Sequence, residues 1–383
     1  MKRNKKTERI IKTLNHEEPD QVPITDFFWS SFLQKWIKEK SLEETANIYD
    51  YYDLDLVVVN PNMDPVPKMP EVIENNEEHV IYKSGWGSTV KINKEDPMPA
   101  FLDFSIKDHN DYTDFEFHDP KDSIRYDGTR GDLINMADSF NPDLPSLTDQ
   151  IKSLEEDFCL FGGVCEPNEV LTRARGMKNT FYDLAMYPKK VKEFAERTVD
   201  FMIEIGKEQL QRYDCLSGMV IWGDIAYDNG MFYAPDTWRK IFKPAVARLC
   251  EALKNEKEGL KLVYHGCGDA QPVYDDLIEI GIDGYNPVEV KADLDVLELK
   301  REYQNRLAFY GNIDVRTLAD GDREDVKKEV LRKLNAAKNG GYIVASDHSV
   351  PGNAKVKNYD YLVELVKEYG QYPLDLGEFE VEI

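Results

Sequence analysis

Residues 218–265 have the sequence GMVIWGDIAYDNGMFYAPDTWRKIFKPAVARLCEALKNEKEGLKLVYH. The two ends of this stretch, 218–222 and 261–265, are short apolar runs of strand length, and residues 235–254 between them carry apolar side chains at helical spacing. A strand, a helix and a second strand in this order predict two parallel strands joined by a crossover helix.

The same alternation extends in both directions along the chain. Further strands are expected at 22–25, 54–59, 158–165, 284–287, 307–312 and 342–345. Further helices are expected at 7–14, around 32–36, between the strand at 158–165 and about residue 213, and at 270–280, 294–303, 323–338 and 358–369. Eight strands alternating with helices predict an α/β fold of the closed (β/α)₈ or TIM-barrel type, with the helix at 7–14 covering one end. No strand is followed by a glycine-rich nucleotide-binding loop, which argues against an open doubly wound sheet.

Residues 61–145 interrupt this alternation with many Pro, Asp and Asn residues and no sustained helical period. The segment is rich in aromatic residues, and so much apolar surface is expected to be buried. We therefore predict a hairpin-rich insertion packed on the barrel, and one domain spanning residues 1–383.

Composition limits the partners. The formal net charge of −24 disfavours nucleic acid and anionic membrane surfaces. No apolar run approaches the roughly 18 to 20 residues of a membrane span, and the basic start MKRNKKTERI is not followed by the apolar segment of a signal peptide. Five scattered cysteines suit a reducing compartment, so a cytoplasmic protein is expected. The oligomeric state stays open, a homodimer included.

Functional residues of such barrels lie where the strands end. His265 and Cys267 are two residues apart at one strand end, so their side chains point to the same side and can contact one zinc ion. Gly266 and Gly268 leave room around the pair. The alternative is structural: a buried cysteine and a hydrogen-bonded core histidine.

Carboxylates follow other strands too, Glu289 and Asp314 among them. Glu166 is a candidate third zinc ligand, and its alternative role is to cap the next helix. Asp224 is a candidate for orienting a substrate, and Asp26 stands at the first strand end as a candidate substrate-binding residue.

Asp347 and His348 end the last predicted strand. A histidine beside an aspartate at a barrel mouth can act as acid, base or metal ligand, because the imidazole titrates near neutral pH. The alternative is a pair that stabilises the loop.

Several segments together resemble one known family, the uroporphyrinogen decarboxylase superfamily, over nearly the whole chain. These segments are ERIIKTLNHEEPDQVPI (8–24), SGWGSTVKI (84–92), FHDPKDSIRY (117–126), GDIAYDNGMFYAPDTWRKIFKP (223–244), YHGCGD (264–269), GYNPVE (284–289), FYGNIDVRTLADGDREDV (309–326) and GGYIVASDHSVP (340–351). The resemblance implies the same barrel fold.

Two branches of this superfamily are relevant. The haem-pathway decarboxylase uses a pair of arginines after its first strand, whereas this chain has no arginine between Arg9 and Arg125. The corrinoid-linked methyltransferases that act on thiols resemble the chain at His265 and Cys267 but have a second cysteine near the last strand. Here no cysteine follows Cys267, and His348 stands in that region.

What remains is a resemblance to the members that take methyl groups from methoxylated compounds in anaerobic one-carbon metabolism. It implies an O-demethylase that moves the methyl group to the Co(I) corrinoid of a corrinoid-binding partner protein, assisted by zinc or by protonation from His348. Trp222, Tyr264 and Tyr310 suit an aromatic substrate, although a core role is the alternative. Two other functions stay open: methylcorrinoid-dependent transfer to a thiol or folate, and uroporphyrinogen decarboxylation, for which His348 matches the decarboxylase family.

Overall fold

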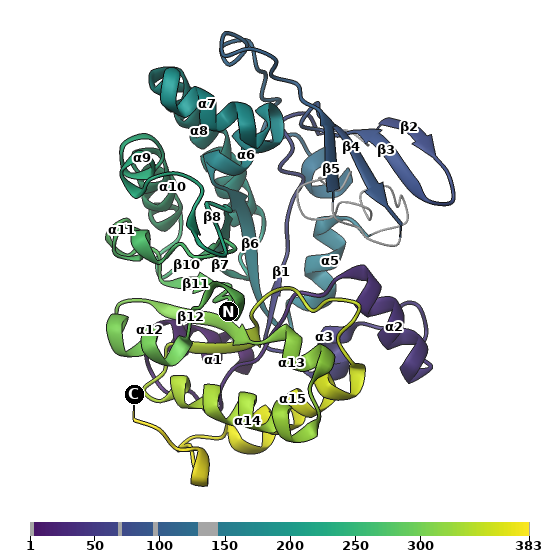
Figure 1. Cartoon of the computed structure of the whole chain (residues 1–383), viewed down its shortest axis with the longest axis vertical. Helices are drawn as coiled ribbons and strands as arrows, with labels where there is room; N and C mark the ends of the chain where they lie inside the picture. The colour runs from purple at the N-terminus through teal and green to yellow at the C-terminus, as the bar shows by residue number, and fades with distance from the viewer. Residues whose placement is uncertain (1–3, 68–70, 95–98, 129–144, 383) are drawn as a thin grey trace.

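The computed structural model describes residues 4–67, 71–94, 99–128 and 145–382, and one parallel sheet forms its centre (Figure 1). Seven strands form this sheet in the order β1-β6-β7-β10-β11-β12-β13. Their bounds are β1 (Leu56–Val58), β6 (Cys159–Cys165), β7 (Leu216–Trp222), β10 (Lys261–His265), β11 (Gly284–Asn286), β12 (Ala308–Ile313) and β13 (Tyr342–Ser346). All neighbouring pairs are parallel, as the alternation of strands and helices predicts.

Residues 22–25 close this sheet into a barrel because they lie between its two edge strands, β13 and β1. On the β13 side, the N–H of Val344 donates to the carbonyl of Pro23 over 2.9 Å, and on the β1 side the N–H of Asp55 donates to the carbonyl of Ile24 over 2.8 Å. Since proline has no N–H, the expected first strand is reduced to an isolated bridge between Ile24 and Val344. The predicted (β/α)₈ barrel is confirmed, with this short segment in the place of the eighth strand.

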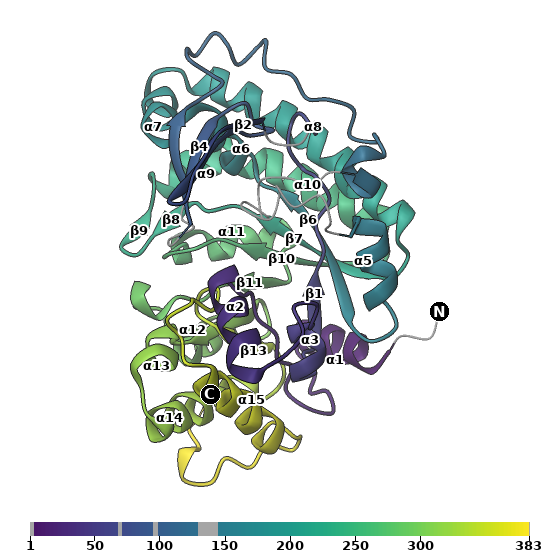
Figure 2. The same cartoon turned by 90° about the vertical axis from the view of Figure 1, so that its right-hand side faces the viewer.

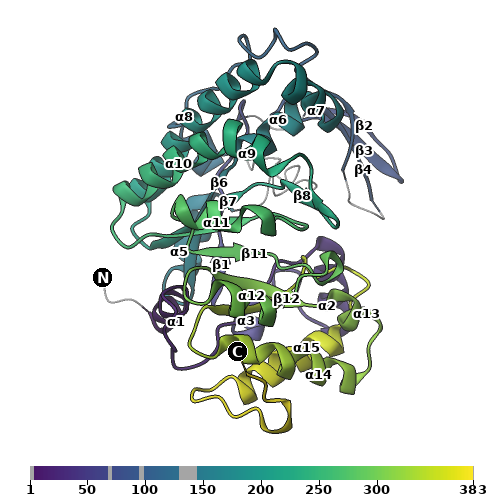
Figure 3. The same ribbon diagram turned by 60° about the vertical axis from the view of Figure 1, so that its left-hand side comes forward.

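Helices surround the barrel. In Figure 3, α8 and α10 lie above the sheet and α12, α14 and α15 below it, and Figure 2 shows the same two groups from another side. The helices are α1 (Lys5–Leu14), α2 (Ser30–Lys40), α3 (Ile48–Tyr52), α5 (Leu147–Leu154), α6 (Pro167–Arg175), α7 (Met177–Met186), α8 (Pro188–Arg212), α9 (Pro235–Ile241), α10 (Lys243–Glu256), α11 (Tyr274–Glu279), α12 (Val296–Tyr303), α13 (Val315–Asp320), α14 (Arg323–Leu334) and α15 (Val356–Tyr369). Shorter helical turns are η1 (Ile124–Gly128), η3 (Gln271–Val273), η4 (Val290–Ala292), η5 (Asn335–Ala337) and η6 (Gly377–Phe379). Over the described residues, no helix combines the length and apolarity needed to cross a membrane.

Helix α1 covers one end of the barrel, as predicted. Its residues Ile10 and Leu14 are buried and pack with the apolar side chains of the barrel interior, among them Leu56 and Phe161. Helix α1 does not cover the opposite end of the barrel, at the carboxyl ends of the strands, where a functional site is expected.

Alternation along each strand separates two apolar cores. In β10, Val263 belongs to the barrel interior, whereas Tyr264 belongs to the larger core between sheet and helices. The next residue, His265, again faces inward, because successive strand side chains point to opposite faces. This alternation decides which residues at the strand ends face a common cavity.

The segment after β6 differs from the single long helix that we expected from this strand to about residue 213. Three helices, α6, α7 and α8, occupy it. The first break is at Gly176, whose φ of +83° lies in the left-handed region, and a side chain there would collide with Phe104. The second break precedes Pro188, which starts α8.

The insertion contains a four-stranded antiparallel sheet of β2 (Glu71–Asn75), β3 (His79–Lys83), β4 (Thr89–Asn93) and β5 (Pro99–Asp103). Tyr82, Val90 and Ile92 form a small apolar cluster of its own, whereas Trp86 and Tyr126 belong to the main core. Residues 68–70, 95–98 and 129–144 of the predicted insertion lie outside the described residues. The single-domain organisation stays a prediction.

Candidate active site

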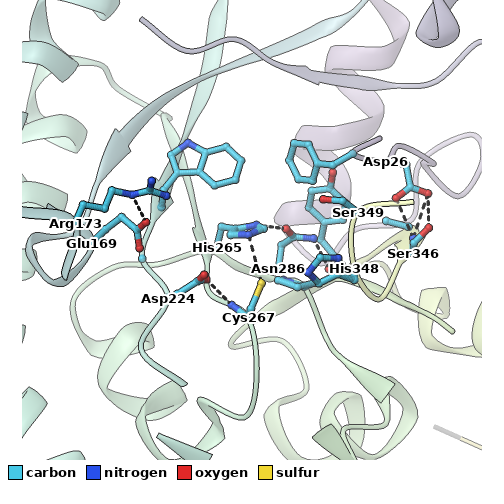
Figure 4. A pocket seen from close by; sticks show the side chains of 16 residues that line it. Asp26, Glu169, Arg173, Asp224, His265, Cys267, Asn286, Ser346, His348 and Ser349 are labelled. Carbon is cyan, nitrogen blue, oxygen red and sulfur yellow. Dashed lines mark hydrogen bonds and ion pairs between the residues drawn. The ribbon is translucent and has the colours of Figure 1, made fainter. Parts of the chain in front are cut away.

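A cavity of about 210 Å³ lies at the carboxyl ends of the strands (Figure 4). The lining residues come from β7, β10, β11, β12 and β13 or the loops after them, from the segment after residue 25, and from α6. They are Asp26, Phe27, Glu169, Arg173, Trp222, Gly223, Asp224, His265, Cys267, Asn286, Pro287, Tyr310, Ala345, Ser346, His348 and Ser349. This is the end at which barrel enzymes carry their active sites.

His265 and Cys267 face each other in this cavity. The Nε2 of His265 lies 4.0 Å from the Sγ of Cys267, and its Nδ1 lies 2.6 Å from the Oδ1 of Asn286. Burial lowers the pKa of His265 and raises the pKa of the Cys267 thiol well above its usual range. A cation between them would reverse the second effect, because a coordinating thiol is deprotonated.

Two groups of potential metal ligands share Cys267. One contains Asp224, His265 and Cys267, and the other contains Cys267, Glu289 and His348; within each group the ligand atoms lie within 4.8 Å of one another. Nitrogen, sulfur and carboxylate oxygen are the donors that zinc prefers in proteins. The geometry supports the pairing of His265 with Cys267 that their spacing predicts.

Glu289 is an unusual member of the second group. Its side chain is fully buried, and neither carboxylate oxygen accepts a hydrogen bond. Lys291 lies nearby, with its Nζ 3.2 Å from one oxygen. The ammonium of Lys291 offsets part of the cost of burying this carboxylate, and a cation or a proton donor on the Cys267 side would offset more of it.

Glu166 does not join either group and does not line the cavity. Its Oε2 accepts from the N–H of Asn168 over 2.7 Å, and its Oε1 accepts from the indole N–H of Trp238 over 3.2 Å. Burial raises its pKa to about 8. The structure thus corrects the expected metal role: Glu166 caps the start of α6, which was its alternative reading, and Asp224 and Glu289 are the carboxylates near Cys267.

Asp347 and His348 do not act as a pair. The Oδ1 of Asp347 accepts from the N–H of Val315 and its Oδ2 from the N–H of Val290, both over 2.9 Å. Asp347 lies off the cavity wall and joins two loops, which corrects its expected catalytic role. His348 lines the cavity, and its ring stacks on Trp29 with 6.4 Å between centroids.

Aromatic side chains form one wall of the cavity. Trp222 and Tyr310 line it as predicted, together with Phe27, whose ring centroid lies 5.5 Å from that of Trp222 and 6.0 Å from that of Tyr310. Tyr264 does not: it is fully buried and packs outside the barrel beside Tyr285. The alternation that turns His265 inward turns its neighbour Tyr264 outward, and this corrects the expected substrate contact.

Asp26 lines the cavity but is only 2% exposed. Its carboxyl accepts from the N–H of Ser346 over 3.2 Å and from the hydroxyl of Ser346 over 2.8 Å. Burial is the main reason why the pKa of Asp26 is raised to about 8. The group is therefore mostly protonated at neutral pH and able to donate a hydrogen bond.

This protonation predicts a pH dependence of stability. The unfolded chain ionises Asp26 near pH 4, so the folded protein holds one proton more than the unfolded chain between about pH 4 and about pH 8. The contribution of this proton to the free energy of unfolding is fully present below that window and is lost as the pH rises through it. We expect the free energy of unfolding of the wild type, relative to Asp26→Asn, to fall by up to about 1.4 kcal/mol per pH unit. Urea unfolding of both proteins between about pH 5 and pH 8 measures this, and a constant difference would contradict it.

Sequence reasoning missed several lining residues. Glu169 and Arg173 lie on α6, four residues apart, and form an ion pair of 2.7 Å. Nothing at a strand end signals them, because they come from a helix. Asn286 and Phe27 do stand at strand ends, next to Pro287 and Asp26, and the rule that led to Asp26 would also have found them.

The fold and the site define a class: a (β/α)₈-barrel protein with imidazole, thiol, carboxylate and aromatic groups around one cavity at its mouth. Residues 121–369 match the uroporphyrinogen decarboxylase (URO-D) family, and the chain belongs to this family.

One solved structure agrees with the fold. A methyltransferase from Methanosarcina mazei is similar at a TM-score of 0.68 and 15% sequence identity, over 95% of this chain and 98% of that one. A B12-independent methionine synthase from Shewanella sp. W3-18-1 matches at a TM-score of 0.42 and 11% identity, over 83% of this chain and 82% of that one. No curated protein sequence matches the chain.

Proposed function

We propose that this protein is a methyltransferase that takes a methyl group from a methoxylated aromatic compound and passes it to the Co(I) corrinoid of a partner protein. One observation carries the proposal: two groups of potential metal ligands meet at Cys267, beside a cavity that aromatic side chains line. The fold shared with a protein described as a methyltransferase supports it.

The donor set fits zinc. His265, Cys267 and Asp224 would hold the ion, because they form one group and include both residues of the His-x-Cys motif. The buried carboxylate of Glu289, which lies 3.2 Å from the ammonium of Lys291, offers a second way to complete the site on the other side of Cys267. When bound, zinc supplies a Lewis acid that withdraws charge from the ether oxygen.

The chain's own residues supply binding and a proton. Phe27, Trp222 and Tyr310 hold the aromatic ring. As the carbon–oxygen bond breaks, its electron pair stays on oxygen, and His348 donates the proton that turns the departing phenolate into a phenol. The corrinoid is a substrate that the partner brings, and its cobalt is the nucleophile.

Uroporphyrinogen decarboxylation fits the cavity less well. Within the described residues, the wall holds one arginine, Arg173, and that arginine already pairs with Glu169. A porphyrinogen with eight carboxylates needs several guanidinium partners. Transfer of a methyl group from a corrinoid to a thiol would use the same ligands. An assay with both kinds of substrate distinguishes this reaction from O-demethylation.

The assay combines the purified chain, a corrinoid protein reduced to Co(I) and a panel of methoxylated aromatics. We expect the corrinoid spectrum to shift to the methylated form while an equal amount of phenol appears, with anisole-type ethers ahead of methyl thioethers. Uroporphyrinogen and methylcorrinoid with a thiol are the parallel substrates. Conversion of either of these, with no phenol from the panel, would contradict the proposal.

A further inference from the structure

We propose that Asn286 is a positioning residue that selects which nitrogen of His265 binds the metal. It holds His265 in the tautomer with the proton on Nδ1, so that Nε2 presents its electron pair to the Cys267 side of the cavity. The consequence for metal binding rests on the proposed function, whereas the tautomer itself is a property of the metal-free chain.

The argument starts at a backbone carbonyl. The carbonyl of Tyr310 can only accept, and the side-chain amide of Asn286 lies 2.9 Å from it. The amide nitrogen Nδ2 must therefore face Tyr310, and the amide oxygen Oδ1 must face His265. Because Oδ1 can only accept, the Nδ1 of His265, 2.6 Å away, must carry the proton.

The surroundings keep this arrangement in place. The residues stand on three neighbouring strands, β10, β11 and β12, and His265 is paired in register with Asn286. The backbone carbonyl of Asn286 also accepts from the N–H of Gly266 over 2.8 Å. The imidazole packs against Trp222 and Phe27, with ring centroids 4.6 Å and 5.9 Å away, so a rotation of the ring meets both.

The chemical consequence is at the other nitrogen. With Nδ1 protonated, Nε2 is the ligand nitrogen, and it is the one that lies 4.0 Å from the Sγ of Cys267. The opposite tautomer would point an N–H at the metal position and block it. Groups that orient a metal-binding histidine in this way are worth about 10- to 100-fold in metal affinity.

The tautomer is measurable by ¹H–¹⁵N correlation spectra of the metal-free protein labelled with ¹⁵N-histidine, at a pH where His265 is neutral. His265→Gln identifies the signals. We expect a protonated Nδ1 and an unprotonated Nε2 in the wild type, and in Asn286→Asp, whose carboxylate still accepts from Nδ1. Asn286→Leu should show the other tautomer or a mixture, and competition with a chromogenic chelator should show zinc bound about 10- to 100-fold more weakly.

Asn358→Leu is the matched control, because Asn358 is also buried and its amide also donates to backbone carbonyls, those of Leu318 and Gly321, but it lies near α13 and away from the cavity. It should lose stability and keep both the tautomer and the zinc affinity. A wild type with the proton on Nε2, or an Asn286→Leu that keeps the wild-type tautomer, would overturn the inference. If the tautomer is as expected but no methyl transfer occurs, the proposed function fails and this inference about His265 stands.

Discussion

His348→Ala is expected to lower the turnover of a methoxylated aromatic about 10²- to 10⁴-fold while KM changes little, because a positioned acid acts mainly in the transition state. His348 lines the cavity beside Cys267, and Asp347 does not restrain it. The loss should be smaller for ethers whose phenol is more acidic, since a better leaving group needs the proton less. Single-turnover rates over a series of ring substituents measure this.

The zinc content of variants distinguishes the two roles considered for His348, proton donor and zinc ligand. Cys267→Ala removes the ligand common to both groups, so it should lose both zinc and activity, whereas His348→Ala should keep about one zinc per chain. Asp347→Asn should lower stability more than turnover, because its oxygens accept only backbone N–H groups. Zinc lost from His348→Ala would make His348 a ligand rather than the acid, and an unchanged turnover would remove it from the mechanism.

The second large effect is on stability. Arg125 is fully buried, and its guanidinium donates to five backbone carbonyls, those of Asn62, Asp64, Pro65, His118 and Asp119. It also lies over the ring of Phe201 at 4.9 Å. Arg125→Ala would leave several carbonyls without a donor and open a cavity, so we expect a loss of about 3 to 5 kcal/mol in the free energy of unfolding.

Denaturant unfolding of Arg125→Ala and Arg248→Ala tests this expectation. Arg248 instead forms two ion pairs, with Glu196 and Asp200, and its side chain is 46% exposed, so its loss should cost no more than about 1 kcal/mol. Arg125→Lys keeps the charge but cannot reach five acceptors, and it should still be clearly destabilised. Equal losses at positions 125 and 248 would mean that the carbonyls around Arg125 find water or other donors.

The barrel was predictable because its signals are local. Period-2 and helical spacing define β7, α10 and β10 within one stretch, and the rule that sites lie at strand ends led to Asp26, Asp224, His265, Cys267 and His348. The breaks inside residues 167–213 were not recognised, although Gly176 and Pro188 mark them in the sequence. The helix ends there because Gly176 has a positive φ and lies against Phe104. The spacing of apolar residues in the sequence shows neither of these features.

The order of strands and helices, the family and the strand ends that bear the site follow from the amino-acid sequence alone, because each depends on the spacing and identity of neighbouring residues. Which polar group at a strand end faces the cavity depends instead on the folded chain. Glu166 turns to Trp238 and Asp347 to Val290 and Val315, and these partners lie far away in the sequence. A buried polar group takes its orientation from whichever donors surround it, and the fold brings those donors together from separate segments of the chain.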